Sequence, residues 1–322
     1  MYNLFKPYGK ISWEKEFVGK YVNILGLDGP EPAQEEIDAK LAVCDILQAD
    51  VDIQVNKELF DKAPNLKAVF CTSIGLDYVD IEEATRRGIL IAHNPDFCIL
   101  AVAEYAVGMM YAVMRNIPGG AESVKAGRWS DRGILKGAEL YGKTLGVVGF
   151  GKTGREVARQ AMGIGMNVVA YDPYMNHELA ESMGVKATDM DEVLREGDII
   201  TVHVPLMDAT RGLIGRKQFA MMKDGVYFIN VARGGIVEED ALYEALASGK
   251  AAGAAIDVMS KEPPEEDSCL LQYEGKNLII TPHIAWYTAE AAEKNHEFFA
   301  EQVKSFTEGE LPKATVNKEV FR

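Results

Sequence analysis

The residues that most clearly suggest chemistry are three glycines, Gly149, Gly151 and Gly154, which directly follow a short apolar run at residues 145–148. Such a run is typical of a buried parallel strand. Gly149 allows a tight turn off the strand, Gly151 lets a phosphate approach the backbone, and Gly154 lets the next helix pack closely. Because a helix N-terminus offers free N–H groups and a positive dipole end, the segment predicts a pyrophosphate-binding turn.

An acidic residue, Asp172, ends the next apolar run, residues 167–171. An acid about 20 residues beyond the glycines can accept both ribose hydroxyls of an adenosine, and its charge repels a 2′-phosphate. Asp172 is followed by Pro173 and Tyr174 rather than by an arginine, so NAD is favoured over NADP. A glycine-rich turn without a ligand is the alternative. Strand, glycines, helix, strand and acid in this order favour dinucleotide binding.

Hydride chemistry beside a nicotinamide needs a group that exchanges a proton, and histidine is the usual candidate. The chain has five histidines. His177 and His296 lie on polar helical stretches and are expected to be solvated. His93, His203 and His283 each follow an apolar run, whose end meets the crevice of a doubly wound sheet. Spacing alone does not choose among these three.

A second requirement is a group that holds the substrate. Arg233 follows the apolar run 227–230 between the small residues Ala232 and Gly234, which leave room for a guanidinium to meet a carboxylate with two parallel hydrogen bonds. A surface ion pair explains Arg233 equally well on the residues alone. Glu262 lies in an acidic, proline-bearing loop, where a solvated charge is the simpler interpretation.

The composition limits the classes of function. The chain of 322 residues is long enough for two domains, and its net charge of −15 argues against nucleic acid or an anionic membrane as a partner. The four cysteines have neither C-x-x-C nor zinc-site spacing, so we expect no metal and a cytoplasmic location. Residues 1–20 lack the apolar core of a signal peptide, and the most apolar stretch, 99–113, is too short to cross a bilayer.

Strand and helix patterns alternate after the first 20 residues, which give no clear pattern. The expected strands before the long helix are 21–27, 46–55, 66–71 and 89–93, and the expected helices are 32–43, 57–62 and 81–87. A helix at 99–115 and another at 121–126 precede the glycine turn, and the last helix is 289–306. The predicted fold class is α/β with two doubly wound parallel-sheet domains. A Rossmann nucleotide domain, 100–284, is inserted into a flavodoxin-like substrate domain, 1–99 and 285–322.

Several motifs together resemble the D-isomer-specific 2-hydroxyacid dehydrogenase family. They are the glycine turn with Asp172, His-Val-Pro-Leu at 203–206, Asn-Val-Ala-Arg-Gly-Gly-Ile-Val at 230–237, Ala-Ala-Ile-Asp-Val-Met-Ser-Lys-Glu-Pro-Pro at 254–264, and Thr-Pro-His-Ile-Ala at 281–285. The resemblance covers nearly the whole chain and is weakest before about residue 65.

The resemblance implies roles for individual residues. The family's catalytic arginine, glutamate and histidine fall on Arg233, Glu262 and His283, and its aspartate beside the nicotinamide falls on Asp257. The implied substrate-binding residues are Ser73, Ile74, Gly75, Arg233, His283 and Trp286, of which the first three form a loop that binds a carboxylate through backbone N–H groups. The implied cofactor-binding residues are Gly149, Phe150, Gly151, Lys152, Thr153, Gly154, Tyr171, Asp172, His203, Val204, Pro205, Thr210, Val231, Ala232, Arg233, Asp257, His283 and Ala285.

The implied reaction is reversible hydride transfer between NADH and the C2 carbonyl of a 2-oxo acid. Protonated His283 would give its proton to the ketone oxygen, Arg233 would polarise the carbonyl, and Glu262 would hold the far imidazole nitrogen. The segment from His283 to Trp286 also resembles the C-terminal binding protein co-repressors, which supply the non-enzyme alternative of an NAD(H)-gated dimer that recruits partners. The sequence shows no polar tail of the kind such regulators carry, so we expect an enzyme.

The motifs only partly narrow the range of acids that could be the substrate. Phosphoglycerate is less favoured, because Cys71 and Thr72 stand where phosphoglycerate dehydrogenases usually carry a base, and because the sequence ends without their regulatory domain. Phosphite is disfavoured by Ile74, which replaces a lysine. The segment ending at Trp286 resembles hydroxypyruvate and glycerate reductases. The resemblance also implies a homodimer built largely on 99–115; a helix buried within one subunit is the alternative.

Overall fold

The computed structural model describes residues 1–27 and 32–321. The chain divides into two compact units. The first unit comprises Met1–Cys98 and the segment from Thr288 onwards, and the second unit is Ile99–Tyr287. The assignment of the two parts to substrate and nucleotide, with boundaries at 99/100 and 284/285, remains a prediction.

The first unit is built on a five-stranded sheet in which all neighbouring strands are parallel. The strand order β2-β1-β3-β4-β5 is that of flavodoxin-like doubly wound sheets. Its elements are β1 (Asn3–Phe5), α1 (Ser12–Phe17), β2 (Asn23–Leu25), α2 (Gln34–Leu41), β3 (Ile46–Ala49), α3 (Lys57–Lys62), β4 (Ala68–Cys71), α4 (Ile81–Arg87), β5 (Leu90–Ala92), α12 (Ala289–Thr307) and the 3-10 helix η3 (Lys318–Val320).

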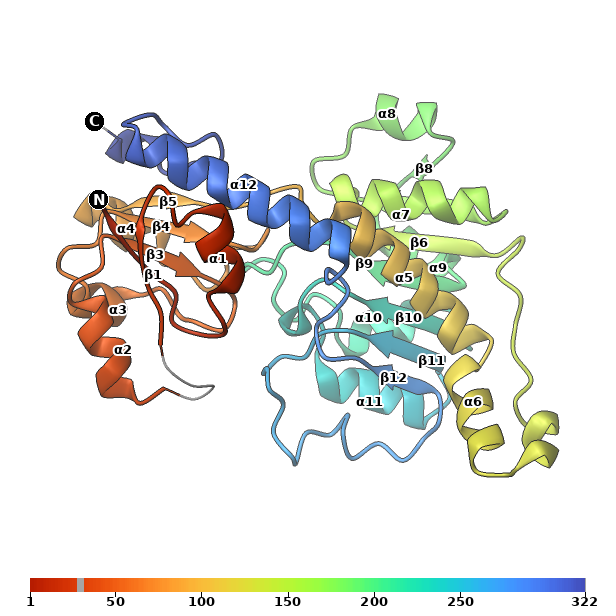
Figure 1. Cartoon of the computed structure of the whole chain (residues 1–322). Helices are drawn as coiled ribbons and strands as arrows, with labels where there is room; N and C mark the ends of the chain where they lie inside the picture. The colour runs from red at the N-terminus through yellow and green to blue at the C-terminus, as the bar shows by residue number, and fades with distance from the viewer. Residues whose placement is uncertain (28–31, 322) are drawn as a thin grey trace. The chain divides into compact units, whose positions relative to one another are not determined.

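Alternate residues of these strands face opposite sides of the sheet, and each side is covered by helices. Phe5 packs with Leu41 of α2 and Phe60 of α3, whereas Leu4 packs on the other face with Phe299 of α12. A fully buried side chain of this size contributes about 1.5–3 kcal/mol. The C-terminal helix α12 therefore completes the core of the first unit, along the face opposite α2 and α3 (Figure 1).

The first 20 residues give no clear sequence pattern, yet they supply β1, an interior strand of this sheet. β1 pairs with β2 on one side and with β3 on the other. The strand has only three residues, and the apolar pair Leu4 and Phe5 is too short to be recognised as a strand by periodicity. Helix α1 follows and buries Glu14 completely.

The second unit is built on a seven-stranded sheet, again with parallel neighbours throughout. The order β12-β11-β10-β9-β6-β7-β8 contains the Rossmann arrangement, with the reversal of strand order between β6 and β9. Its strands are β6 (Thr144–Val148), β7 (Asn167–Tyr171), β8 (Lys186–Ala187), β9 (Ile199–Val202), β10 (Val226–Asn230), β11 (Ala251–Ile256) and β12 (Leu278–Ile280). Two doubly wound parallel sheets confirm the predicted fold class.

Helices cover both faces of this sheet. One hydrophobic cluster contains residues of α5 and α7, and the other contains residues of α9, α10 and α11. The helices of this unit are α5 (Ile99–Met114), α6 (Ile117–Lys125), η1 (Trp129–Gly133), α7 (Lys152–Gly163), α8 (His177–Ser182), α9 (Met190–Glu196), α10 (Arg216–Met221), η2 (Gly234–Ile236) and α11 (Glu239–Ala247). In the described part of the chain, no helix has the length and apolarity needed to cross a membrane.

The sequence-based boundary of α6 is wrong. We expected one helix to end at residue 115 and the next to begin at residue 121, but α6 begins at Ile117, with Pro118 in its first turn. Proline fits the first turn of a helix, because its missing N–H would have no intrahelical partner there. Asn116 precedes the helix in a left-handed conformation and makes the bend from α5.

Candidate active site

The glycine turn has the geometry that its sequence predicts. Gly149 has φ +101°, which favours glycine, and an added Cβ would lie 2.7 Å from the backbone of His203. A Cβ on Gly154 would lie 2.0 Å from the Gly149 carbonyl oxygen, so helix α7 packs directly on the turn. A Cβ on Gly151 would meet no protein atom within 4 Å. The turn therefore leaves room for a ligand next to the N-terminus of α7.

Asp172 is held beside this turn. Its Oδ2 accepts a hydrogen bond of 2.8 Å from the Phe150 amide, and its Oδ1 accepts one of 2.8 Å from the Tyr174 amide. The carboxylate is thus fixed in orientation, and its remaining lone pairs suit two ribose hydroxyls. A second negative charge, such as a 2′-phosphate, would be repelled. The turn and Asp172 fit an NAD molecule.

His203 follows β9, at the point where the strand order reverses. Its Nε2 lies 2.9 Å from the Thr201 hydroxyl, and burial lowers the pKa of the imidazole to about 4. His203 is therefore neutral near pH 7 and cannot act as a proton donor there. In the loop that follows, the Thr210 hydroxyl donates a hydrogen bond of 2.6 Å to the Pro205 carbonyl and accepts one of 2.9 Å from the Met207 amide. The Thr210 side chain therefore stabilises the conformation of this loop.

Arg233 lies in a turn directly after β10, and a buried asparagine shapes that turn. The Asn230 side chain is 1% exposed. It accepts a hydrogen bond of 3.0 Å from the Ala232 amide and donates one of 3.0 Å to the Arg233 carbonyl. A Cβ on the next residue, Gly234, would lie 1.9 Å from the Met259 carbonyl carbon. The backbone that carries Arg233 therefore packs directly against the backbone that leads to Glu262.

Glu262 and His283 form a direct pair. His283 Nδ1 lies 2.7 Å from Glu262 Oε2, and the other carboxylate oxygen accepts 2.9 Å from the Met259 amide. Burial opposes ionisation of Glu262, but the hydrogen bond and charge of His283, with a contribution from Arg233, hold its pKa below the ordinary value. The carboxylate is therefore ionised near pH 7 and leaves Nε2 as the His283 nitrogen that can exchange a proton.

The turn that carries His283 is organised by one buried acid. Asp257 follows β11 and is 1% exposed. Its carboxylate accepts three hydrogen bonds: one of 2.5 Å from the Thr281 hydroxyl, one of 3.0 Å from the Ile284 amide and one of 2.7 Å from the Ala285 amide. Burial raises its pKa despite these donors. His283 itself has φ +54°, a conformation that is uncommon outside glycine. Asp257 thus fixes the backbone of the turn from which the His283 imidazole projects.

These groups share one edge of the sheet. Strands β6, β7, β9, β10, β11 and β12 are parallel, so their carboxyl ends meet on the same side. The remaining predicted cofactor residues follow the same strand ends. Val231, Val204, Phe150 and Ala285 are buried, Tyr171, Thr153 and Ala232 are partly buried, and Lys152 and Pro205 are exposed. Trp286, a predicted substrate residue, is partly buried and meets the Tyr287 ring edge-on.

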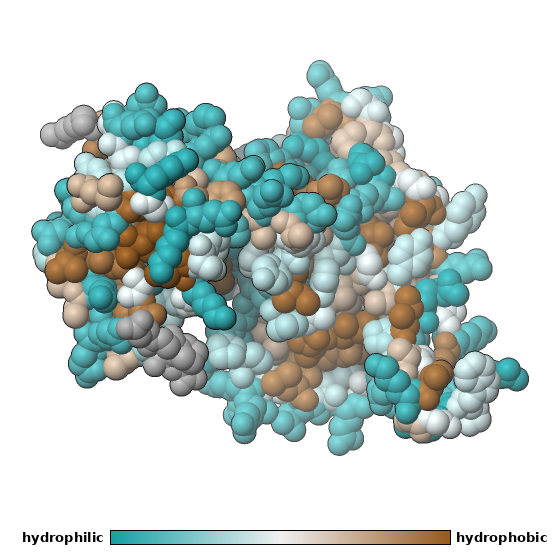
Figure 2. Space-filling model, viewed as in Figure 1, coloured by the Kyte–Doolittle hydropathy of each residue, from teal (hydrophilic) through white to brown (hydrophobic). Residues whose placement is uncertain are grey.

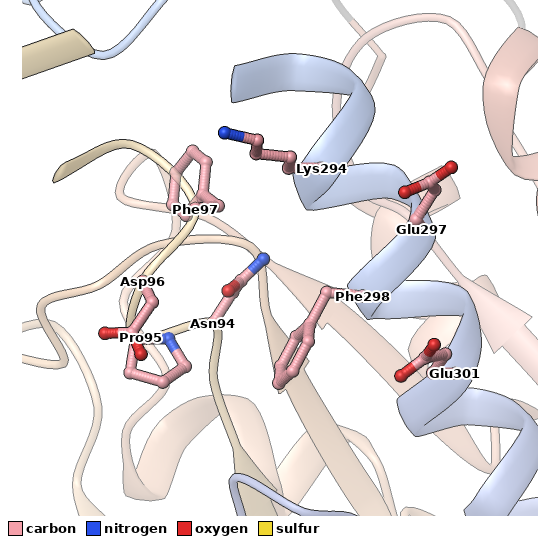
Figure 3. Close-up of a pocket in the computed structure, with 8 residues that line it drawn as sticks. All are labelled: Asn94, Pro95, Asp96, Phe97, Lys294, Glu297, Phe298 and Glu301. Atoms are coloured by element: carbon pink, nitrogen blue, oxygen red, sulfur yellow. The ribbon is translucent and has the colours of Figure 1, made fainter. Parts of the chain in front are cut away.

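The predicted carboxylate loop, Ser73, Ile74 and Gly75, belongs to the first unit and follows β4. His93, the third candidate histidine, donates from Nδ1 to the Ile74 carbonyl at 2.9 Å and is therefore a partner of this loop. Nearby, the segment after β5 and helix α12 face each other across a groove of about 290 Å³ (Figure 3). Its lining combines two aromatic rings with three carboxylates and one lysine: Asn94, Pro95, Asp96, Phe97, Lys294, Glu297, Phe298 and Glu301.

Among the described residues, no three His, Cys, Asp or Glu side chains converge as a metal site would require. Three polar residues that hold the backbone of the site were not predicted as site residues. They are Thr201, Asn230 and Thr281. Asn230 carried a usable signal, since a polar residue at the end of a buried strand needs partners.

Comparison with known proteins agrees with this geometry. Residues 107–285 match the model of the D-isomer specific 2-hydroxyacid dehydrogenase, NAD binding domain. The chain belongs to the D-isomer-specific 2-hydroxyacid dehydrogenase family. The predicted family is thereby confirmed, and NAD is confirmed as the cofactor of this domain. The structure is also similar to a D-lactate dehydrogenase from Aquifex aeolicus complexed with NAD and lactic acid, with TM-score 0.86 and 30% identity over 95% of this chain and 96% of that one.

Curated members of the family share more sequence with the chain. It is 44% identical over 285 residues to D-3-phosphoglycerate dehydrogenase of Methanocaldococcus jannaschii, which covers 88% of this chain and 54% of that protein. It is 46% identical over 264 residues to the enzyme of the same name from Archaeoglobus fulgidus, covering 82% and 50%. The chain spans about half the length of these relatives. Their name differs from the hydroxypyruvate or glycerate reductases that the segment at 283–286 resembles.

Proposed function

We propose that the protein is an NAD-dependent D-2-hydroxyacid dehydrogenase in which His283 is the general acid and base. One observation carries the proposal: His283 Nδ1 is paired at 2.7 Å with an ionised Glu262, at the strand edge that also holds the glycine turn. A histidine that is oriented by a carboxylate is the usual device for exchanging one proton near neutral pH. Bound NADH supplies the hydride.

His283 acts through Nε2, since Nδ1 is engaged by Glu262. In the direction of reduction, protonated Nε2 donates its proton to the substrate's C2 oxygen. The negative charge of Glu262 stabilises the imidazolium before transfer and keeps the ring in one orientation. In the direction of oxidation, neutral Nε2 accepts the hydroxyl proton.

Arg233 supplies a fixed positive charge for the developing alkoxide and for the substrate carboxylate. Its backbone is held by Asn230, and its charge reaches Glu262. Removing a single preorganised donor of this kind usually costs about 10²–10³ in kcat. We assign the amides of Ile74 and Gly75 to the substrate carboxylate as well.

We propose a substrate without a phosphate group. The loops after β3, β4 and β5 span residues 50–56, 72–80 and 93–98 and contain no lysine or arginine. They contain five aspartates instead: Asp50, Asp52, Asp77, Asp80 and Asp96. A phosphate monoester carries about −1.5 to −2 charges at pH 7, which this edge would repel. Cys71, at the position of the expected base, is buried and uncharged.

Initial rates test the function and the substrate together. NADH oxidation is measured with glyoxylate, pyruvate, hydroxypyruvate and a branched 2-oxo acid, and NAD reduction is measured with D-lactate and D-3-phosphoglycerate. We expect turnover with at least one unphosphorylated acid and little with D-3-phosphoglycerate. Preference for D-3-phosphoglycerate would overturn the substrate proposal, and no turnover with any acid would favour a binding protein of the co-repressor kind.

We also propose a homodimer, which the apolar surface of α6 and η1 supports. Ile117 and Val124 of α6 are 55% and 54% exposed, and Trp129 and Ile134 are 70% and 75% exposed. Figure 2 shows hydrophobic side chains among hydrophilic ones over this region. Sedimentation velocity at micromolar concentration should give a dimer, and Ile134→Asp should dissociate it. Leu271→Asp, at another exposed position, is the control; a monomeric wild type would contradict the proposal.

The cysteines support a cytoplasmic location. Cys44, Cys71, Cys98 and Cys269 form no disulfide bonds, and the first three are buried. Free thiols persist in reducing compartments. Fractionation of the source cells with an antibody against the protein should recover it in the cytoplasmic fraction, and recovery with an extracytoplasmic fraction would contradict this location.

A further inference from the structure

The loop after β4 has an unusual hydrogen-bond pattern: four successive carbonyl groups each accept a bond from within the first unit. Two of the donors are side chains from distant elements, one is a backbone amide, and one is a hydroxyl of the loop itself. In chain order, Thr72 accepts from Asn295 Nδ2 at 2.9 Å, Ser73 from the Asn94 amide at 3.3 Å, Ile74 from His93 Nδ1 at 2.9 Å, and Gly75 from Ser73 Oγ at 2.8 Å.

The amides of the same loop are in the opposite situation. Among the described residues, the N–H groups of Ser73, Ile74 and Gly75 donate to no protein acceptor. Unpaired backbone N–H groups are rare in a partly buried segment, and successive ones attract an anion. The amides of the loop therefore remain available to an anion only while its carbonyl groups stay hydrogen-bonded to the rest of the first unit.

Proton counting identifies the residue that fixes the last of these bonds. A carbonyl can only accept, so the single hydrogen of Ser73 is committed to Gly75. Ser73 Oγ also lies 2.7 Å from the Tyr78 hydroxyl, and Tyr78 must therefore be the donor in that contact. Tyr78 is 5% exposed, and burial raises its pKa well above the ordinary value, so its proton is retained.

Cys71, the last residue of β4, is 2% exposed and lies beside Tyr78. Burial raises the pKa of its thiol to about 12, so it stays protonated. The series of donors that fixes the loop therefore runs from the Tyr78 hydroxyl to Ser73 Oγ, and from Ser73 Oγ to the Gly75 carbonyl.

We propose that Tyr78 is a positioning residue for the substrate: its hydroxyl holds Ser73 in the rotamer that binds the Gly75 carbonyl and so keeps the Ile74 and Gly75 amides available to a carboxylate. The inference rests on the proposed function, in which this loop receives the 2-oxo acid. Tyr78 itself need not touch the substrate. Phenylalanine at this position would keep the packing and remove only the donor.

The test compares Tyr78→Phe, Ser73→Ala and the double variant with wild type, using the best 2-oxo acid of the substrate panel. We expect the KM for that acid to rise on the order of tenfold in Tyr78→Phe, with kcat within about twofold and NADH affinity unchanged. The double variant should be no worse than Ser73→Ala, because Tyr78 acts through Ser73. Tyr21→Phe, a partly buried tyrosine of the same unit, is the matched control and should keep the wild-type KM.

An unchanged KM in Tyr78→Phe, additive effects in the double variant, or parallel loss of kcat and NADH affinity would overturn the inference. Hydrogen exchange measured by mass spectrometry separates it from the proposed function. Residues 72–77 should exchange faster in Tyr78→Phe, whereas α4 should not change. If wild type reduces no 2-oxo acid, the proposed function fails, and this exchange result alone then supports or overturns the positioning role.

Discussion

Two loops of this molecule have opposite hydrogen-bond patterns: one has its backbone amides bonded within the protein, and the other has its backbone carbonyl groups bonded. The turn at 281–285 in the second unit gives its amides to the buried carboxylate of Asp257. The loop at 72–75 in the first unit gives its carbonyl groups to donors, among them Asn295 and His93. Both follow a parallel strand, so the secondary structure does not account for the difference.

The difference shows how a loop can be prepared for its role. When a buried acid accepts hydrogen bonds from the amides, the backbone is held rigid and a side chain is left to meet the substrate, here the His283 imidazole. When buried donors take the carbonyl groups, the amides remain and the backbone itself is presented to an anion. Asp172 follows the first pattern, because it accepts two backbone amides beside the glycine turn.

The largest expected effect comes from removing the side chain that the turn presents. His283→Ala should lower kcat by about 10²–10⁴-fold, since the proton donor is lost. NADH affinity, measured by fluorescence titration, should stay within a few-fold of wild type. His177→Ala, on an exposed helix, is the control and should keep full activity. Wild-type kcat in His283→Ala would remove the histidine from the mechanism.

The next effect comes from removing the acid beneath the turn. Asp257→Ala leaves two amides and a hydroxyl without their acceptor, at about 1–3 kcal/mol for each buried donor that stays unpaired. We expect a clearly lower midpoint of thermal unfolding together with a large loss of kcat. Asp224→Ala, which removes an exposed acid that pairs with Lys250, should leave the midpoint of thermal unfolding close to that of wild type. Equal stability of the two variants would break the comparison between the loops.

A smaller effect is expected when only the charge behind His283 is removed. The folded pKa of Glu262 lies below its ordinary value of 4.5, so its charge is present above that pH and is lost as the pH falls through the folded value. Glu262→Gln lacks the charge at every pH. The imidazolium of His283 then loses its neighbouring negative charge, so the alkaline limb of kcat/KM for reduction should move to lower pH.

Two pH profiles measured in parallel check this prediction. Glu265→Gln, an exposed acid that pairs with Lys261, should keep the wild-type profile. If Glu262→Gln lowers activity equally at all pH values, Glu262 acts only as a structural partner of the Met259 amide.

The sequence predicts the parts of the site that depend on local pattern. The glycines, Asp172 and the strand ends at His203 and Arg233 follow from short-range spacing, because a parallel sheet brings its carboxyl ends to one edge. The choice of His283 does not follow from spacing. The physical reason for that choice is the contact between His283 and Glu262, whereas the imidazole of His203 is partly buried and bonded to Thr201.

Other features could not be predicted because they depend on contacts between distant residues. Asn295 bonds to Thr72 across more than 220 positions of sequence, and no local pattern indicates such a pair. Tyr78 looks like an ordinary core residue until its hydroxyl partners are known. The three-residue strand β1 lies inside the sheet only because β2 and β3 pair with it on either side.

The most direct test of the account separates cofactor binding from chemistry at one residue. Arg233→Ala is titrated with NADH by calorimetry, and its single-turnover NADH oxidation is followed with the best 2-oxo acid. The account predicts that NADH still binds, with an affinity within a few-fold of wild type, while turnover is slower by about 10²-fold or more. Loss of NADH binding in proportion to turnover, or turnover close to wild type, would contradict it.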